Sequence, residues 1–176
     1  MELIPGAALS ILDRLTRNVP QELQDLNQWG FKTSWGQCPW SVWNAAARVN
    51  DPATWSTWES VIVRFDVSRH RCLNFCFFSG CGVGGCDLDA CRDPETGHVS
   101  DWAMNFVDRF DSYTEISPSG TGLHVFFRTT LAGKTVKQVI AGELKIGEKT
   151  PQVEIFTRNH ACSVTGNVFE GRNLFR

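Results

Sequence analysis

Six short segments rich in aromatic, aliphatic and cysteine residues lie between residues 73 and 166. They read LNFCFFS, GGCDLD, SYTEIS, GLHVFFR, PQVEIFT and ACSVTG. Apolar segments of this length, bounded by turn residues, predict strands. We expect the first two to flank a turn at Gly80–Gly85, the middle two to flank the PSGTG turn and the last two to form a final pair. Few helices and several hairpin-linked strands favour an α+β domain, with an antiparallel or mixed sheet covered by helices on one face.

The N-terminal third is helical and aromatic. Ala7–Leu15 and Gln21–Asn27 are amphipathic, and Pro20 separates them. The irregular stretch Trp29–Trp43 follows, with glycine and proline as breakers. Six tryptophans lie in residues 29–58. We expect them to pack between the helical layer and the sheet more than to stack on nucleic-acid bases.

Two further helices are predicted near the strands. Residues 50–65 carry Asp51 as an N-cap and Pro52 as a first helical residue. Residues 100–110 form an apolar pattern preceded by Ser100, another good cap. By contrast, residues 133–150 are rich in lysine and glycine, so we expect a mobile excursion between strands.

The size and charge of the chain limit what it does. Its 176 residues suit one domain, which we assign to residues 1–176. The net charge of -2 gives no global basic signal, so binding to nucleic acid would need a local patch or metal ions. No apolar run is long enough to span a bilayer, and charged residues interrupt Met1–Leu15 where a signal peptide would be apolar. We therefore expect no membrane partner and a cytoplasmic location.

The seven cysteines admit two interpretations. Five of them lie four or five residues apart between Cys72 and Cys91, with His70 and His98 nearby. This arrangement raises a cysteine-rich zinc domain as an alternative, but the paired C-x-x-C spacing is absent. On strands such spacing also points side chains to both faces. Small, reduced core side chains are the favoured interpretation, and zinc is not expected.

Two aspartates stand one residue apart in the strand GGCDLD. On a strand, Asp87 and Asp89 face one way while Leu88 faces the core. Two such anions repel each other unless a cation lies between them, and oxygen ligands favour Mg²⁺ or Mn²⁺ over zinc. Two interpretations of the aspartate pair therefore stay open: a divalent metal site, or an exposed strand end that carries two aspartates.

The segment SPSGTGLH has the composition of an anion-binding turn. Hydroxyl groups come from Ser117, Ser119 and Thr121, while Gly120 and Gly122 allow a tight backbone whose N–H groups point at an anion. His124 follows on the outgoing strand and could donate to a phosphate oxygen. The segment lacks the lysine of a P-loop, so an ordinary hairpin turn is the alternative.

A third carboxylate, Glu154, lies between Val153 and Ile155 in the strand QVEIF. By itself it fits a solvent-facing strand residue. Together with Asp87, Asp89 and the glycine-hydroxyl turn, it makes a coherent set. Two metal ions held by carboxylates beside a triphosphate cradle are what in-line nucleotidyl transfer needs.

The ordered segments DPATW, CDLDACRDPETG, SYTEISPSGTGLHV and VEIFTRNHACSVTG resemble the primase-polymerase domains of phage and plasmid replication proteins. These domains belong to the archaeo-eukaryotic primase superfamily, and the resemblance runs from about Gln28 to Gly171. It implies an RRM-like catalytic sheet, preceded here by the helical and aromatic N-terminal segment. It also implies template-directed synthesis of DNA or RNA primers from nucleoside triphosphates.

The resemblance also assigns roles and partners. Asp87, Asp89 and Glu154 match the acidic residues that hold two catalytic Mg²⁺ or Mn²⁺ ions. His124, with Gly122, matches the histidine motif that contacts the phosphates of the incoming nucleotide. The implied partners are nucleoside triphosphates, a single-stranded or primed DNA template and a replicative helicase domain, in a bacterial or phage-infected cell. The chain is then either a fragment of a longer replication protein or a minimal stand-alone version.

Several positions depart from the family pattern. Ala90 stands where a histidine often follows the aspartates, and Gln37 stands where a basic residue is usual. His160 occupies the place of an arginine, and Arg158, two residues earlier, is the candidate that would compensate for it in nucleotide binding. Missing cations would weaken contacts with triphosphate or template. The alternative function is therefore a catalytically weakened accessory module that binds nucleotide or DNA.

Overall fold

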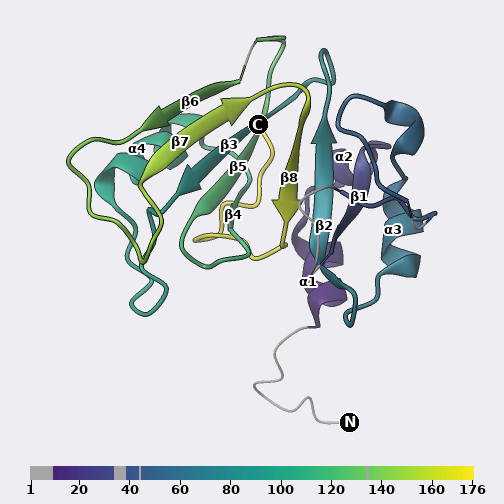
Figure 1. Cartoon of the computed structure of the whole chain (residues 1–176), viewed down its shortest axis with the longest axis horizontal. Coiled ribbons are helices and arrows are strands. Elements are labelled where there is room, and N and C mark those ends of the chain that lie inside the picture. Colours follow the sequence, from purple (N-terminus) through teal and green to yellow (C-terminus); the bar gives the residue numbers. More distant parts are fainter. Residues whose placement is uncertain (1–9, 34–38, 44, 134) are drawn as a thin grey trace.

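The computed structural model describes residues 10–33, 39–43, 45–133 and 135–176, and within them the chain forms two antiparallel sheets with α-helices around them (Figure 1). One sheet has the order β1-β2-β8 and the other the order β4-β5-β3-β7-β6. The three-stranded sheet contains β1 (Trp29–Thr33), β2 (His70–Phe77) and β8 (His160–Val164). The five-stranded sheet contains β3 (Val83–Asp89), β4 (Thr114–Ile116), β5 (Leu123–Arg128), β6 (Val136–Val139) and β7 (Gln152–Phe156). The prediction of an α+β fold with antiparallel strands is confirmed.

Of the helices in the described residues, one covers the five-stranded sheet, and the buried residues of the other three belong to the main core. The helices are α1 (Ile11–Asn18), α2 (Gln21–Gln24), α3 (Trp58–Arg64) and α4 (Asp101–Phe110), with a 3-10 turn, η1, at Pro52–Thr54. The apolar side of α4 packs on one face of the five-stranded sheet, where Ala103 and Val107 meet Leu88 and Leu123 of the strands. The opposite face of that sheet is turned toward the three-stranded sheet, and the aromatic residues Phe77 and Phe156 pack there in the main core.

The predicted strands form, but two of the expected pairings are wrong. β2 and β3 lie in different sheets, and so do β7 and β8. Positive φ angles at Gly80 and Gly82, and at Asn159 in the second connection, turn the chain out of one sheet and into the other. The pairing between PSGTG-linked strands is as expected, because β4 and β5 are antiparallel neighbours.

The helix predicted for residues 50–65 is interrupted. η1 ends at Thr54, and α3 begins only at Trp58, where the hydroxyl of Thr57 accepts a hydrogen bond from the backbone N–H of Ser60. Between them, Ser56 exchanges two backbone hydrogen bonds with Trp29 of β1. This pairing holds the backbone extended, so local helix propensity loses to a long-range contact.

The other N-terminal predictions hold in part. α1 extends to Asn18, beyond the predicted segment, whose first residues lie outside the described part of the chain, and α2 ends at Gln24. Trp29, Trp55 and Trp58 are buried as expected, whereas Trp43 is 72% exposed and Trp35 lies outside the described residues. Residues 133–150 are not merely a loop, because β6 adds an edge strand to β7.

The cysteines that suggested zinc are mostly core residues. Cys72, Cys76, Cys86 and Cys91 are buried, and burial raises the pKa of each thiol, to about 11 for Cys72 and about 12 for Cys76 and Cys91. They are therefore neutral thiols that pack as small apolar groups. In the part of the chain that the structure describes, no helix is long and apolar enough to cross a membrane.

Candidate functional site

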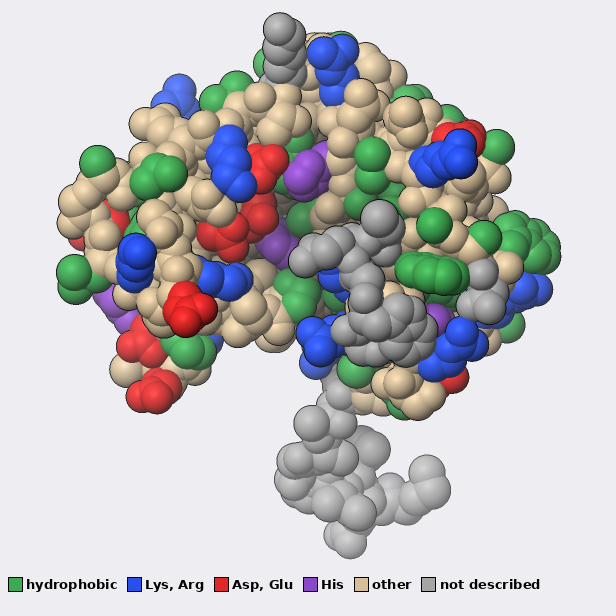
Figure 2. All heavy atoms as spheres, viewed as in Figure 1, with side chains coloured by type: hydrophobic (Ala, Val, Ile, Leu, Met, Phe, Trp, Pro, Cys, Tyr) green, Lys and Arg blue, Asp and Glu red, His purple; other side chains and the backbone are tan. Residues whose placement is uncertain are grey.

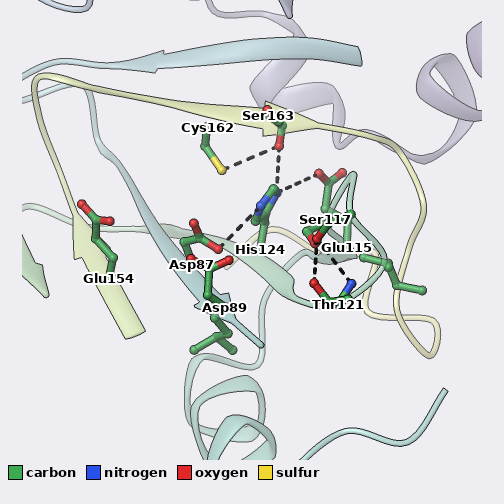
Figure 3. A network of polar contacts seen from close by, with 12 residues as sticks. Asp87, Asp89, Glu115, Ser117, Thr121, His124, Glu154, Cys162 and Ser163 are labelled. Atoms are coloured by element: carbon green, nitrogen blue, oxygen red, sulfur yellow. Dashed lines mark hydrogen bonds and ion pairs between the residues drawn. The ribbon is translucent and has the colours of Figure 1, made fainter. Parts of the chain in front are cut away.

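A single row of ionisable side chains crosses the five-stranded sheet. Asp87 on the central strand β3 pairs directly with His124 of β5 on one side and Glu154 of β7 on the other. Beyond them, His124 pairs with Glu115 of β4 and Glu154 pairs with Lys137 of β6. Directly paired residues of antiparallel strands project from the same face. The face is the one opposite α4, because Leu88 packs against that helix. The register therefore brings Asp87, His124 and Glu154 together (Figure 3).

Asp87 is the least satisfied member of this row. Its Oδ1 atom is buried without a hydrogen-bond partner and lies 3.7 Å from Nε2 of His124. Burial raises the pKa of Asp87, nearby His124 lowers it, and Asp89 and Glu154 raise it further, with a net upward shift. A buried carboxylate oxygen with no partner is costly unless a proton or a cation compensates it. The donor set around Asp87 thus fits a hard divalent cation.

Asp89 and Glu154 have lysine partners. Asp89 accepts a 2.8 Å hydrogen bond from the Gln152 amide, and Nζ of Lys149 lies 3.6 Å from its Oδ1. Nζ of Lys137 lies 3.5 Å from Oε2 of Glu154. Among the described residues, no group of three or more His, Cys, Asp and Glu side chains converges closely enough to hold a metal ion. Metal binding by the three carboxylates stays a prediction, although they share one face.

The turn from Ser117 to Gly122 lies at the end of β3. Its hydroxyl groups form a chain, with 3.1 Å from Ser117 Oγ to Ser119 Oγ and 2.8 Å on to Thr121 Oγ1. Nζ of Lys149 donates to Ser119 Oγ at 3.1 Å. Gly122 has no room for a side chain, since a Cβ there would lie 2.6 Å from the carbonyl oxygen of Leu88. The turn therefore presents hydroxyl groups and one ammonium beside the aspartates, whereas the N–H groups of Gly120 and Thr121, which were expected to point at an anion, donate to Ser117 and Ser119 within the turn.

The loop after β3 is tied to the same turn. The backbone N–H groups of Cys91 and Arg92 both donate to the carbonyl of Thr121, and the Arg92 guanidinium donates to the carbonyl of Gly120. Ala90, between them and the aspartates, has a φ of 50°. The aspartate motif and the glycine-hydroxyl motif are thus held as one unit, although they are far apart in the sequence.

His124 is enclosed by hydrogen-bonding groups from two strands. Its Nδ1 lies 2.9 Å from the backbone carbonyl of Ser163 on β8 and 3.5 Å from Oε1 of Glu115 (Figure 3). Burial by itself lowers the pKa of His124, but neighbouring Cys162, Glu115 and Asp87 outweigh it and raise the pKa well above its usual value. Because these contacts come from β8 as well as β4, the histidine joins the two sheets.

Of the remaining predicted residues, His160 lies on β8 of the three-stranded sheet, beside the Glu154 end of the row. His160 stacks on the ring of Phe156, with 3.8 Å between ring centroids, and its Nδ1 lies 3.9 Å from Oε1 of Glu154. Burial lowers the pKa of His160. Arg158 lies in the bend between β7 and β8, not on a strand beside His160. Gln37 is outside the described residues.

Sequence reasoning missed several members of the site. Glu115 is fully buried in β4. The sequence could have indicated it as a site residue, because it is a charged residue in a strand-like segment, as Glu154 is. Lys137 and Lys149 had no such signal, since they lie in the segment expected to be an excursion. The pairing of β6 with β7 places Lys137, and Lys149 lies in the connection between these two strands.

A cleft of about 630 Å³ is lined in part by Ser117, Pro118 and Ser119 of the same turn. Arg14 of α1 and Arg71 of β2 line it, together with Thr165 and Asn167. Figure 2 shows acidic and histidine side chains gathered at a hollow between the two sheets, with lysine and arginine side chains around it. The surface next to the carboxylates therefore offers positive charge although the whole chain is slightly acidic.

Comparison with known proteins adds one similarity. A phage DNA primase-polymerase is similar to part of this chain. The protein comes from Nitratiruptor phage NrS-1 and is 34% identical over 87 residues, which are 49% of this chain and 11% of the phage protein. No family model matches the chain. The similarity supports the family resemblance over about half of the sequence, and the chain spans only a small part of that relative's length.

Proposed function

We propose that this chain is a nucleotidyltransferase of the primase-polymerase type, which makes or extends DNA or RNA primers from nucleoside triphosphates on a DNA template. Two observations support the proposal. The row His124–Asp87–Glu154 has the expected acidic and histidine groups side by side across three strands. The partial similarity is to a protein named as a DNA primase-polymerase. In this proposal the five-stranded sheet with α4 is an RRM-like catalytic core.

The carboxylates of Asp87, Asp89 and Glu154 would hold Mg²⁺ or Mn²⁺. The observation that carries this assignment is the buried Oδ1 of Asp87, which has no hydrogen-bond partner and only Nε2 of His124, 3.7 Å away, as an ion-pair partner. Such ions lower the pKa of an attacking 3′-hydroxyl and neutralise charge on the phosphates. Ser119 and Thr121 would donate hydroxyl hydrogens to the triphosphate, and Lys149 would supply positive charge beside them. His124 would donate from Nε2, the ring nitrogen on the Asp87 side.

The template would lie along the cationic cleft. Arg14 and Arg71 line that cleft next to the Ser117–Ser119 turn, so phosphates of a single strand could bind there close to the reacting groups. A helicase domain in the same replication system would supply the unwound strand. The template assignment rests on charge and position, and the helicase on the family resemblance alone.

Nucleotide incorporation tests the proposal. The purified chain is given a primed and an unprimed DNA template, nucleoside triphosphates and either Mg²⁺ or Mn²⁺. We expect Asp87→Asn to lower incorporation roughly 100-fold or more, as loss of other groups that stabilise transition-state charge does. Asp101→Asn is the matched control, because Asp101 is exposed on α4 at the opposite face. Activity that survives both Asp87→Asn and Asp89→Asn would refute the metal-dependent mechanism.

A second candidate function is an accessory module that binds nucleotide or DNA without turnover. The observation that favours it is that Lys149 and Lys137 already pair with Asp89 and Glu154. Calorimetry with a non-hydrolysable nucleoside triphosphate separates the two functions. Binding at micromolar concentrations with no incorporation on any template favours the module, whereas incorporation that Asp87→Asn removes favours the enzyme.

A further inference from the structure

Glu115 is a fully buried carboxylate that the nucleotidyl transfer mechanism above does not use. It lies on β4, directly opposite His124 of β5. A buried carboxylate is costly unless hydrogen bonds surround it, so its partners indicate why it is there. The polar groups around it come from Tyr113, from His124 and from the segment that follows β8.

The two oxygens of Glu115 have different surroundings. Oε2 accepts hydrogen bonds from the Tyr113 hydroxyl at 2.9 Å, the Gly166 N–H at 2.9 Å and the Thr165 N–H at 3.1 Å. Oε1 accepts from the Thr165 N–H at 2.9 Å and lies 3.5 Å from Nδ1 of His124. One oxygen is therefore saturated by the protein backbone and a phenol, while the other is turned toward the histidine.

Nδ1 of His124 has a second acceptor close by. The carbonyl oxygen of Ser163 lies 2.9 Å from it, and a carbonyl cannot donate. With a carboxylate oxygen and a carbonyl oxygen both facing Nδ1, this nitrogen must carry a hydrogen. When Nδ1 carries a hydrogen, Nε2 can donate toward Asp87 or a phosphate only if the ring is doubly protonated, and acceptors at Nδ1 favour that form.

We propose that Glu115 is a positioning residue for His124: together with the Ser163 carbonyl it keeps a hydrogen on Nδ1 and fixes the ring so that Nε2 faces Asp87 and the nucleotide. The consequence for activity rests on the proposed function, because it assumes that Nε2 contacts the triphosphate. The orientation of the ring does not depend on that assumption. Within the row, Glu115 then faces Nδ1 of His124 and orients the ring, while Asp87 faces Nε2 on the other side of the ring.

Glu115→Gln is the sharpest variant. The amide oxygen of the new side chain can take the place of Oε2 and keep the hydrogen bonds that Tyr113, Gly166 and Thr165 donate to that oxygen. Its N–H₂ group then takes the place of Oε1 against Nδ1 and loses the 2.9 Å hydrogen bond from the Thr165 N–H, so the variant loses one hydrogen bond, as the control variant below does. A donor then faces Nδ1 where an acceptor stood. We expect the share of His124 with a hydrogen on Nδ1 to fall, and kcat for incorporation to fall roughly 10- to 100-fold, as is typical when the outer partner of a functional histidine is removed.

Nitrogen NMR of the imidazole ring tests the proposal directly. Long-range ¹H–¹⁵N correlation on the full chain distinguishes a ring nitrogen that carries hydrogen from one that does not. In the unmodified protein we expect Nδ1 of His124 to carry hydrogen. A bare Nδ1 there overturns the proposal without any variant, even if Glu115→Gln does not fold.

Tyr113→Phe is the matched control. It removes one hydrogen bond from Oε2 of the same carboxylate and leaves Oε1 facing His124. A purely structural role for Glu115 predicts that both variants lose stability and that neither changes the ring nitrogens. The positioning role predicts a changed Nδ1 signal in Glu115→Gln only, and an unchanged signal there overturns it. If the unmodified chain incorporates no nucleotide at all, the proposed function fails, while the NMR result still decides the role of Glu115.

Discussion

The two faces of β3 differ in character: one carries apolar side chains that pack under α4, and the other carries ionisable side chains. Leu88 pairs with Leu123 and Val153, and this apolar row packs under α4. One residue earlier on β3, Asp87 pairs with His124 and Glu154 of the same two neighbouring strands. Both rows use the same antiparallel pairing, and only the face differs. Stability and chemistry are thus separated by a single step along the chain, so a variant in one row should affect the other only weakly.

The largest expected effect on stability is at Leu88. Leu88→Ala removes a fully buried side chain from the α4 face and should lower the free energy of unfolding by about 2–5 kcal/mol. Urea denaturation followed by circular dichroism measures it. Asp87→Ala, on the other face, should not reproduce this loss. Equal losses for the two variants would show that the two faces are not separable in this way.

A smaller effect is expected at the outer end of the site. Lys149→Met removes the ammonium that contacts both Asp89 and Ser119. Because Lys149 is about half exposed, the change in stability should stay below about 1 kcal/mol. Binding of a nucleoside triphosphate should weaken by roughly tenfold, since one charge-assisted hydrogen bond is lost.

Calorimetric titration of Lys149→Met measures this loss of affinity. The matched control is Lys145→Met, an exposed lysine of the same segment. Equal affinities for the two variants would show that the ammonium of Lys149 does not contribute to triphosphate binding.

The smallest expected effect is on the free energy of unfolding when the charge of Asp87 is removed. Burial raises the pKa of Asp87 in the folded chain, so its charged form is disfavoured there relative to the unfolded chain. Asp87→Asn should therefore be slightly more stable than the unmodified protein at neutral pH. Because the pKa of Asp87 is higher in the folded chain than in the unfolded chain, its charge destabilises the fold fully at pH values above the folded pKa. This destabilisation disappears as the pH falls through the folded pKa toward the ordinary value of 3.8.

The advantage of Asp87→Asn should accordingly shrink between neutral and acidic pH. Urea denaturation of both proteins across that range, without divalent ions, measures the difference. A constant difference at all pH values would mean that Asp87 is not disfavoured in its charged form, and the case for a compensating cation would weaken.

Much of the candidate site could be predicted because strand alternation is local. Asp87 and Asp89 on either side of Leu88, and Glu154 between two apolar residues, indicate their faces without any knowledge of partners. The same rule applies to Glu115, which lies in the predicted strand SYTEIS. Its role could not be inferred from the strand, because the N–H groups that surround its carboxylate come from Thr165 and Gly166, 50 and 51 residues away.

The sequence by itself determined six of the strands, which of their side chains share a face and where the glycine-hydroxyl turn lies, but it did not indicate β1 in the stretch predicted to be irregular or β6 in the predicted excursion. Those properties depend on neighbours a few residues away. Only the tertiary structure decided that β2 and β3, and likewise β7 and β8, belong to different sheets, and that β6 brings Lys137 to Glu154. Strand partners are chosen by burial of the whole core, here around Phe77 and Phe156, and no local pattern contains that information.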